Sequence, residues 1–448
     1  MEKLRAIWHD VVDSLWFLPG LLTLAGGALA ILLVGYNDDI LHDIDAGDVW
    51  WLFGGSAEGA KSVLESISGS IITVTGVVFS VTIIALQLAS SQFTPRVLRQ
   101  FMADRANQSV LGVFIGTFTY TLLVQRTVRS GDAGAEFVPA IAVTGAVLLA
   151  LISIGFFIFF INHLARSIQA AVIIDSVATS AMSVLDSIFP DLVENGTDAH
   201  PPYADELIED LGEGTVIPAP EAGYLQAVDR EGLSRIAGEH DLLICMEVEI
   251  GTYVLPGLTV MRAWPSRRVT KDLAADMCSR LILGLERTPR QDLKHGIIEM
   301  MDIAVKGMSP SINDPTTAIN AVQRMGQVLL DMAWRTGGDS VSLDDDGNIR
   351  LIVRRPRLDQ TTAAAFDQIR HYAADNPTVA IAMIDTLGQL SALSPIASRP
   401  AFTSQLQAVI RTANERITDP GDIERLQSAA GAALAMADQP PPERRPHV

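Results

Sequence analysis

The sequence has few cysteines, few basic residues and few charged residues of either sign. Its 448 residues include only 2 Cys, too few for a disulfide framework or for the common multi-cysteine zinc modules. Lys and Arg number 33 against 52 Asp and Glu, which gives a formal net charge of −19. Because a nucleic-acid-binding protein needs a basic face to neutralise phosphates, we expect no nucleic-acid partner.

The common signatures of enzymes are also missing. We find no phosphate-binding G-x-x-x-x-G-K-S/T loop, no strand followed by G-x-G-x-x-G, no H-E-x-x-H and no G-x-S-x-G. The 8 His show no spacing typical of metal ligands. The sequence therefore predicts a protein that is not an enzyme and that holds no cofactor and no metal.

Hydrophobic residues, in contrast, make up 48% of the chain, with a mean hydropathy of +0.28. A transmembrane helix needs roughly 20 consecutive apolar residues. Four runs without Asp, Glu, Lys or Arg reach or approach that length, at residues 14–36, 66–92, 110–125 and 137–162. We predict a domain of four transmembrane helices over residues 1–163. Since ion-coupled pumps place carboxylates inside the membrane, the absence of such residues argues against active transport.

Lys and Arg are divided unequally between the two sides of this membrane domain. Six lie on the side of the N-terminus: Lys3, Arg5, Arg96, Arg99, Arg105 and Arg166. Three lie on the other side: Lys61, Arg126 and Arg129. The positive-inside rule then predicts a multi-pass protein with both termini in the cytoplasm.

The second apolar run carries a stripe of polar side chains. At about 100° per residue, positions spaced four and three apart share one face of a helix. The residues of this stripe are Ser66, Ser70, Thr73, Val77, Ser80, Ile84, Gln87 and Ser91. Lipid tails cannot satisfy hydroxyl or amide groups, so the stripe is expected to meet protein or water. Two interpretations stay open: a tight seam between helices, or the wall of a pore.

Glycines at regular spacing predict close helix packing. Gly69 and Gly76 flank the stripe, and Gly112 and Gly116 form a G-x-x-x-G in the third run. Small residues let helix backbones approach each other in a membrane. We expect all four glycines to lie in helix–helix contacts.

Charged residues gather at both ends of the expected pore. Five Asp residues follow the first run and are candidates for an outer vestibule that attracts cations: Asp38, Asp39, Asp43, Asp45 and Asp48. Arg96, Arg99 and Arg105 lie in the inner loop. They are expected to line the inner mouth or to bind lipid phosphate.

The rest of the chain is expected to form a cytoplasmic α+β region. Its predicted parts are an amphipathic connecting helix at 164–190, an acidic linker at 191–213, a small β barrel-like module at 214–268, a mainly helical domain at 269–436 and a disordered tail at 437–448.

Local patterns within the helical domain predict individual elements. Helical periodicity covers residues 270–285, 292–306 and 315–334, and residues 339–357 have the pattern of a hairpin. Asp314 before Pro315 is typical of a helix start. The candidates for a subunit contact or a ligand site are Asn313, Asp314, Thr316 and Thr317.

Several stretches resemble the signatures of one known family. Residues 73–80 (TVTGVVFS) and 85–96 (ALQLASSQFTPR) are similar to its second span, and residues 287–292 (RTPRQD) and 309–317 (SPSINDPTT) resemble its cytoplasmic signature. This is an uncharacterised family of bacterial predicted membrane proteins, domain of unknown function 2254. The resemblance extends over nearly the whole chain. It implies an inner-membrane protein with four spans and a cytoplasmic domain, and it implies no particular activity.

The leading hypothesis is a homo-oligomeric ion channel with a weak cation preference, lined by the second span and regulated by the cytoplasmic domain. The alternative is a membrane-anchored sensor or scaffold without conduction, in which the stripe is only a packing seam. A passive or weakly coupled transporter is a further alternative. The expected partners are the lipid bilayer, other copies of the chain and inorganic ions.

Overall fold

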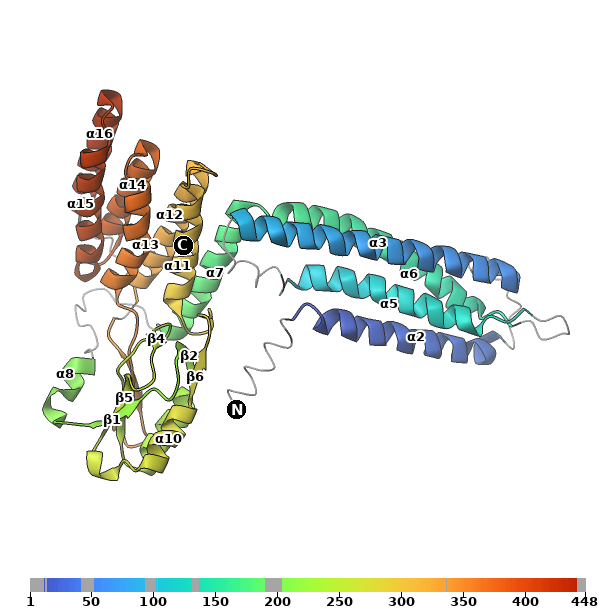
Figure 1. The fold of residues 1–448 in the computed structure, drawn as a ribbon, viewed down its shortest axis with the longest axis horizontal. Coiled ribbons are helices and arrows are strands. Elements are labelled where there is room, and N and C mark those ends of the chain that lie inside the picture. Colours follow the sequence, from blue (N-terminus) through green and yellow to red (C-terminus); the bar gives the residue numbers. More distant parts are fainter. Residues whose placement is uncertain are drawn as a thin grey trace. The chain divides into compact units, whose positions relative to one another are not determined.

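The computed structural model describes residues 12, 14–41, 52–92, 102, 104–130, 137–189, 204–335 and 337–440. The chain forms two compact units, Met1–Gln169 and Ala170–Val448. The first unit consists of apolar helices, and the second combines helices with two small sheets (Figure 1). Each unit is described by itself.

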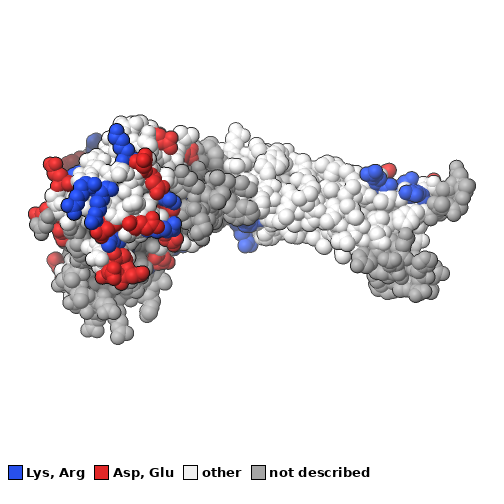
Figure 2. Space-filling model, turned by 90° about the horizontal axis from the view of Figure 1, so that it is seen from below, with Lys and Arg blue, Asp and Glu red and all other residues white. Residues whose placement is uncertain are grey.

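The first unit is a bundle of long apolar helices: α2 (Phe17–Leu41), α3 (Ala57–Gln92), α5 (Arg105–Thr127) and α6 (Ala140–Ser167). The central helix is α5, which packs against each of the other three. Its buried residues extend from Asn107 to Val124. On the described part of the face in Figure 2, no Lys, Arg, Asp or Glu lies over the middle of the bundle. Such a surface suits contact with hydrocarbon, where charges are costly.

The predicted apolar runs lie within these helices, but the helix ends differ. α2 continues to Leu41, beyond the end of the first apolar run at position 36. α3 begins at Ala57, before the apolar run, and its 36 residues make it longer than a membrane span requires. Hydropathy marks only the part of a helix that can contact lipid, whereas the backbone hydrogen bonds continue into polar flanks.

Five helices are long and apolar enough to cross a membrane among the residues that the structure describes, and the fifth is α7 (Ala170–Ile188). A two-residue break at Ile168 and Gln169 separates it from α6. The connecting helix predicted over 164–190 corresponds to α7, which begins at Ala170 because residues up to Ser167 belong to α6. α7 packs in the second unit against α11 (Leu293–Gly307) and α12 (Pro315–Ala333), because its apolar residues recur at helical spacing on one face.

The second unit contains two small sheets. The larger has the order β1 (Thr215–Pro218), β5 (Thr259–Trp264), β3 (Leu243–Met246), β8 (Ile349–Val353), β7 (Ser340–Leu343). The smaller has the order β4 (Tyr253–Val254), β2 (Gly223–Val228), β6 (Leu281–Gly284). An apolar cluster that includes Leu225, Ile244 and Val254 joins the two sheets, together with α9 (Arg230–Glu239).

These strands are not confined to the module predicted at 214–268. β3 pairs in parallel with β8, and Ile244 lies opposite Leu351. β7 and β8 form the hairpin expected within 339–357, with Gly347 at a positive φ of 82° in its turn. The predicted helix over 270–285 is wrong in its second half: α10 (Lys271–Ser279) ends there and β6 follows. Leu281 is buried on β6 because strand pairing with β2 outweighs the local helical pattern.

The remaining elements of this unit are helical. They are α8 (Ala204–Ile208), η1 (Glu209–Leu211), η2 (Ser266–Arg268), α13 (Leu358–Tyr372), α14 (Pro377–Leu393), η3 (Ile396–Ser398), α15 (Arg399–Arg416) and α16 (Pro420–Ala437). α14 packs against α12, α15 and α16. Most of the predicted acidic linker at 191–213 and of the tail at 437–448 lies outside the described residues.

Candidate functional site

The polar stripe of the second apolar run lies on the outward face of α3. All of its described side chains are exposed: Ser66, Ser70, Thr73, Val77, Ser80, Ile84 and Gln87. The side chain of Ser91 lies outside the described residues. α3 packs against α5 and α6, and its buried residues, which include Leu64, Ile71 and Val78, lie on the opposite face. The stripe therefore points away from the other helices of its own chain.

Hydroxyls on both faces of α3 donate to the helix's own backbone. On the inward face, the Thr82 hydroxyl is buried and donates to the carbonyl of Val78 at 2.8 Å. On the outward face, Thr73 donates to the carbonyl of Gly69 and Ser80 to that of Gly76, each at 2.8 Å. A hydroxyl has one donor and two acceptor lone pairs. The outward oxygens of Thr73 and Ser80 therefore present acceptors, because their donors are already used.

The outward faces of α2 and α6 are apolar. α2 exposes Leu21, Leu24, Leu29, Ile31 and Leu32. α6 exposes Val147, Leu148, Leu151, Ile152, Ile154, Ile158, Phe159 and Ile161. α3 also exposes large apolar side chains, which are Ile72, Val77, Phe79, Val81, Ile83, Ile84 and Leu88. It differs from α2 and α6 in the polar groups exposed among them, which are the hydroxyls of Ser66, Ser70, Thr73 and Ser80 and the amide of Gln87.

The four predicted packing glycines behave in two ways. Gly112 and Gly116 lie against α2, where a methyl group on Gly116 would come within 2.8 Å of the Leu22 carbonyl oxygen. At Gly69 and Gly76, no described atom from outside the helix lies within 4 Å of such a methyl position. The first pair therefore allows α2 and α5 to cross closely. The second pair leaves the α3 backbone open on the side of the stripe.

The charged residues predicted at the pore ends are only partly described. Asp38 and Asp39 lie in the last turns of α2, and their side chains are outside the described residues. Asp43, Asp45, Asp48, Arg96 and Arg99 are also outside them. Arg105 is exposed at the start of α5, and its Nη1 donates to Gln108 Oε1 at 3.4 Å.

A side-chain hydrogen bond that the sequence did not reveal lies next to Arg105. His163 Nε2 is 2.5 Å from Asp104 Oδ2, and Asp104 Oδ1 accepts the backbone N–H of Ala106 as the N-cap of α5. This contact links the start of α5 to the end of α6. The two residues are far apart in the sequence, so no local pattern could indicate it.

The segment 309–317 forms the N-terminus of α12. Asp314 caps α12 by accepting the backbone N–H of Thr317 at 3.1 Å and its hydroxyl at 2.6 Å. Asn313 has a positive φ of 49° and is exposed. Thr316 is exposed, whereas Thr317 is buried against the cap. The hydrogen bonds of Asp314 and Thr317 thus serve the local fold, while Asn313 and Thr316 remain on the surface.

The segment 287–292 fastens the small sheet to α11. Arg287 pairs with Asp292, and Asp292 also caps α11 through the backbone N–H of His295 at 3.1 Å. Gln291 Oε1 accepts the backbone N–H of Val228 at 3.1 Å, at the end of β2. These side chains are positioned to hold secondary structure together, and no three His, Cys, Asp or Glu side chains of the described residues come together as a metal site.

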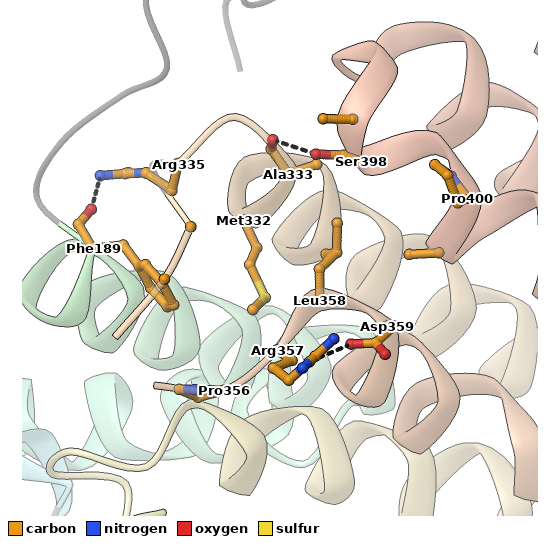
Figure 3. A pocket seen from close by; sticks show the side chains of 14 residues that line it. Phe189, Met332, Ala333, Arg335, Pro356, Arg357, Leu358, Asp359, Ser398 and Pro400 are labelled. Atoms are coloured by element: carbon orange, nitrogen blue, oxygen red, sulfur yellow. Dashed lines mark hydrogen bonds and ion pairs between the residues drawn. The ribbon is translucent and has the colours of Figure 1, made fainter. Parts of the chain in front are cut away.

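A cavity of about 300 Å³ lies at the ends of four helices in the second unit (Figure 3). Its wall includes Phe189 after α7, Met332 and Arg335 at the end of α12, Arg357 before α13 and Pro400 in α15. Figure 3 shows three contacts in this wall, which join Arg335 to Phe189, Ser398 to Ala333 and Arg357 to Asp359. No sequence motif indicated it, because its residues come from four separate segments.

Comparison with known proteins gives one family and several relatives. A family described as "Predicted membrane protein (DUF2254)" matches residues 12–389. An uncharacterized protein of Mycobacterium bovis is 30% identical over 98% of this chain and 84% of its own length. An uncharacterized protein of Mycobacterium tuberculosis shows the same identity and coverage. No solved structure matches the chain.

Proposed function

Because the chain belongs to the DUF2254 family of predicted membrane proteins, we propose that it is a homo-oligomeric ion channel with the outward face of α3 along the conducting path. One observation carries the proposal: the outward face of α3 exposes a row of hydroxyls and the Gln87 amide among its apolar side chains, whereas α2 and α6 expose apolar side chains. An amide such as that of Gln87 is costly in hydrocarbon. If copies of α3 surround a water-filled axis, water and the neighbouring helices would provide the hydrogen-bond partners that lipid cannot provide.

The proposed topology has four spans, formed by α2, α3, α5 and α6. α7 is apolar enough to be a fifth candidate, but its apolar face is already buried against α11 and α12. A helix whose apolar face is already buried in a folded domain gains little free energy by entering lipid. The proposed location is a bacterial inner membrane, and with four spans the excess of Lys and Arg on the side of the N-terminus supports a topology with both termini in the cytoplasm.

The proposed permeant ions are small cations. A dehydrated cation needs oxygen lone pairs, whereas an anion needs N–H or O–H donors. The hydroxyls of Thr73 and Ser80 donate their hydrogens to the carbonyls of Gly69 and Gly76. Their remaining lone pairs suit a cation. The other partners in this proposal are the lipid bilayer and further copies of the chain, with no nucleic acid and no enzymatic reaction.

The test is conductance of the purified protein in planar bilayers, followed by a triple variant. Ser70→Ala, Thr73→Ala and Ser80→Ala together should lower the cation conductance or change its selectivity, because they remove the exposed oxygens. The matched control is Ile72→Val, Phe79→Leu and Ile83→Val on the same exposed helix, which should leave conductance unchanged. A wild-type protein that conducts no ion under any voltage or pH would refute the proposal.

The second candidate is a sensor or scaffold in which the stripe only joins copies of the chain. The openness of Gly69 and Gly76 favours it, since small residues allow close helix contacts without a pore. Under this alternative, the hydroxyl triple variant would alter self-association at most. An oligomer that assembles normally but does not conduct would support the scaffold over the channel.

A further inference from the structure

The start of α5 and the end of α6 meet through a hydrogen bond between a histidine and a carboxylate. His163 Nε2 lies 2.5 Å from Asp104 Oδ2, and the His163 ring stacks on the Phe159 ring with 5.5 Å between their centroids. Both polar side chains are partly buried, with 30% of His163 and 22% of Asp104 exposed. Asp104 Oδ1 accepts the backbone N–H of Ala106 at 2.9 Å. One carboxylate therefore caps α5 and also joins it to α6.

A buried amide near the same helix start lacks hydrogen-bond partners. Asn107 is 2% exposed, and neither its Nδ2 nor its Oδ1 has a hydrogen-bond partner among the described residues. Burying an amide without partners is costly. An arrangement in which water reaches Asn107 would remove this cost. The packed start of α5 thus contains a destabilising group, and the contact between Asp104 and His163 offsets it.

We propose that the contact between Asp104 and His163 is a proton-operated switch for the packing of α5 against α6. Histidine is the side chain that ordinarily changes its charge between pH about 5 and 8. A hydrogen bond to a carboxylate is stronger from a charged imidazolium than from a neutral imidazole. Protonation of His163 therefore favours the packed arrangement. Loss of the proton as the pH rises favours the arrangement in which Asn107 is hydrated.

The charges around the contact leave His163 as the group that titrates near neutral pH. Arg105 on α5 and Arg166 on α6 are the other charged residues of the two helices at this end, and both are exposed. Arginine stays charged throughout this pH range, and carboxyl groups accept a proton only in more acidic solution. α2 and α3 also pack against α5 and α6. Their apolar runs at 14–36 and 66–92 contain no Asp, Glu, Lys, Arg or His.

This switch concerns the packing of the bundle and does not depend on conduction. The side of the membrane follows from the topology proposed above, in which the start of α5 and the end of α6 face the cytoplasm. Under that topology, acidification of the cytoplasm tightens the bundle at its inner end.

The experiment is hydrogen–deuterium exchange with mass spectrometry on the full-length protein in detergent, at pH about 5.5 and about 8. Each measured rate is divided by that of an unstructured peptide at the same pH, which removes the intrinsic pH dependence of exchange. We expect the amides of residues 108–114 to be about fivefold better protected at the lower pH, the effect of adding a charge to one hydrogen bond. Equal protection at both pH values would overturn the proposal.

Three variants test the roles of the individual side chains. Asp104→Asn removes the charge but keeps a good N-cap, and His163→Gln removes the titrating ring. Each should remove most of the pH dependence. Asn107→Leu replaces the unsatisfied amide with an apolar group of similar size, so the start of α5 should stay protected at both pH values. His371→Gln, at an exposed position of α13, is the control and should behave like wild type.

Thermal unfolding shows whether each variant is folded. If His163→Gln does not fold, Asp104→Asn decides the question, because its helix cap is retained. A pH dependence that persists unchanged in a folded variant of either residue would assign the effect to another group and overturn the switch. Loss of protection at the higher pH in Asn107→Leu, as large as in wild type, would also overturn it, since the buried amide would then not drive the opening.

Discussion

Asp292 receives two hydrogen bonds from Arg287 in the interior of the second unit. Nε of Arg287 is 2.6 Å from Oδ2, and Nη2 is 2.7 Å from Oδ1. The Asp292 side chain is 1% exposed. Gly251, at a positive φ of 92°, lies so close that a methyl group there would be 2.2 Å from Asp292 Oδ2. A turn of the sheet region, the 287–292 segment and the start of α11 are therefore fixed at one point.

Replacing Asp292 with Ala should destabilise the second unit strongly. The variant leaves a largely buried guanidinium without its acceptor, and breaking a buried pair in this way costs about 3–5 kcal/mol. Denaturant unfolding followed by circular dichroism measures the loss. Asp276→Ala is the control, because Asp276 forms an exposed pair with Arg280 that is worth about 0.5 kcal/mol. Equal stability of the two variants would contradict the assigned role of the buried pair.

Adding one methyl group should have different effects at two glycines. Gly116→Ala should lower the thermal stability of the bundle by about 1–3 kcal/mol, because the new group meets the α2 backbone at Leu22. Gly76→Ala should leave the fold of a protomer unchanged, since its methyl position is open. If copies meet at α3, Gly76→Ala should instead weaken self-association. Thermal unfolding and light scattering of both detergent-solubilised variants separate these outcomes.

A cysteine at position 73 should form cross-links between copies. Thr73 is exposed on the α3 stripe, whereas Leu151 is exposed on the apolar face of α6. Mild oxidation should therefore dimerise Thr73→Cys and leave Leu151→Cys monomeric on a non-reducing gel. Burial raises the pKa of the native Cys245 to about 12 and also raises the pKa of Cys278. Both thiols stay protonated near neutral pH and should react slowly. Equal cross-linking at positions 73 and 151 would count against an α3 interface.

Acid should remove the contribution of Asp344 to the β7–β8 hairpin. Its pKa is lowered to about 2 by the hydrogen bond from the Asn348 backbone N–H, with help from Arg350. A carboxylate with a depressed pKa stabilises the fold above its ordinary pKa of about 3.9 and loses this effect as the pH falls toward 2. Asp344→Asn should therefore lower the unfolding temperature at pH 7, by about 1–3 °C. The difference from wild type should shrink between pH about 4 and about 2.

The matched variant for this turn is Asp346→Asn, which changes an exposed carboxylate of the same hairpin. It should unfold like wild type at each pH. A constant difference between Asp344→Asn and wild type down to pH about 2 would show that the carboxylate charge is not the cause.

The sequence predicted the features that depend on neighbouring residues. The apolar runs lie in α2, α3, α5 and α6, and the spacing of Ser66 to Gln87 places them on one face. Periodicity could not determine which of the hydroxyl-bearing side chains of α3 face inward. Burial of Ser68 and Thr82 against outward exposure of Ser70 and Thr73 depends on where α5 and α6 pack, and this information is not local to α3.

Long-range pairings account for most of what the sequence did not reveal. Ile244 lies opposite Leu351 in a parallel pair, so the sheet needs strands from outside the segment predicted as a β module. Leu281 continues a helical pattern but is buried on β6, opposite Val228. The cavity combines the ends of α7 and α12 with the starts of α13 and α15. None of these partners shares a short sequence window.

The central position of α5 has a consequence for biogenesis. Among the four helices of the bundle it is the least apolar and the most enclosed, so on its own it would partition weakly from the translocon into lipid. Ribosomes deliver α2 and α3 first, and these helices supply the contacts that α5 requires. Insertion of α5 is therefore coupled to tertiary assembly. Substitutions at the α2–α5 crossing should reduce the amount of protein that reaches the membrane before they affect any property of the mature protein.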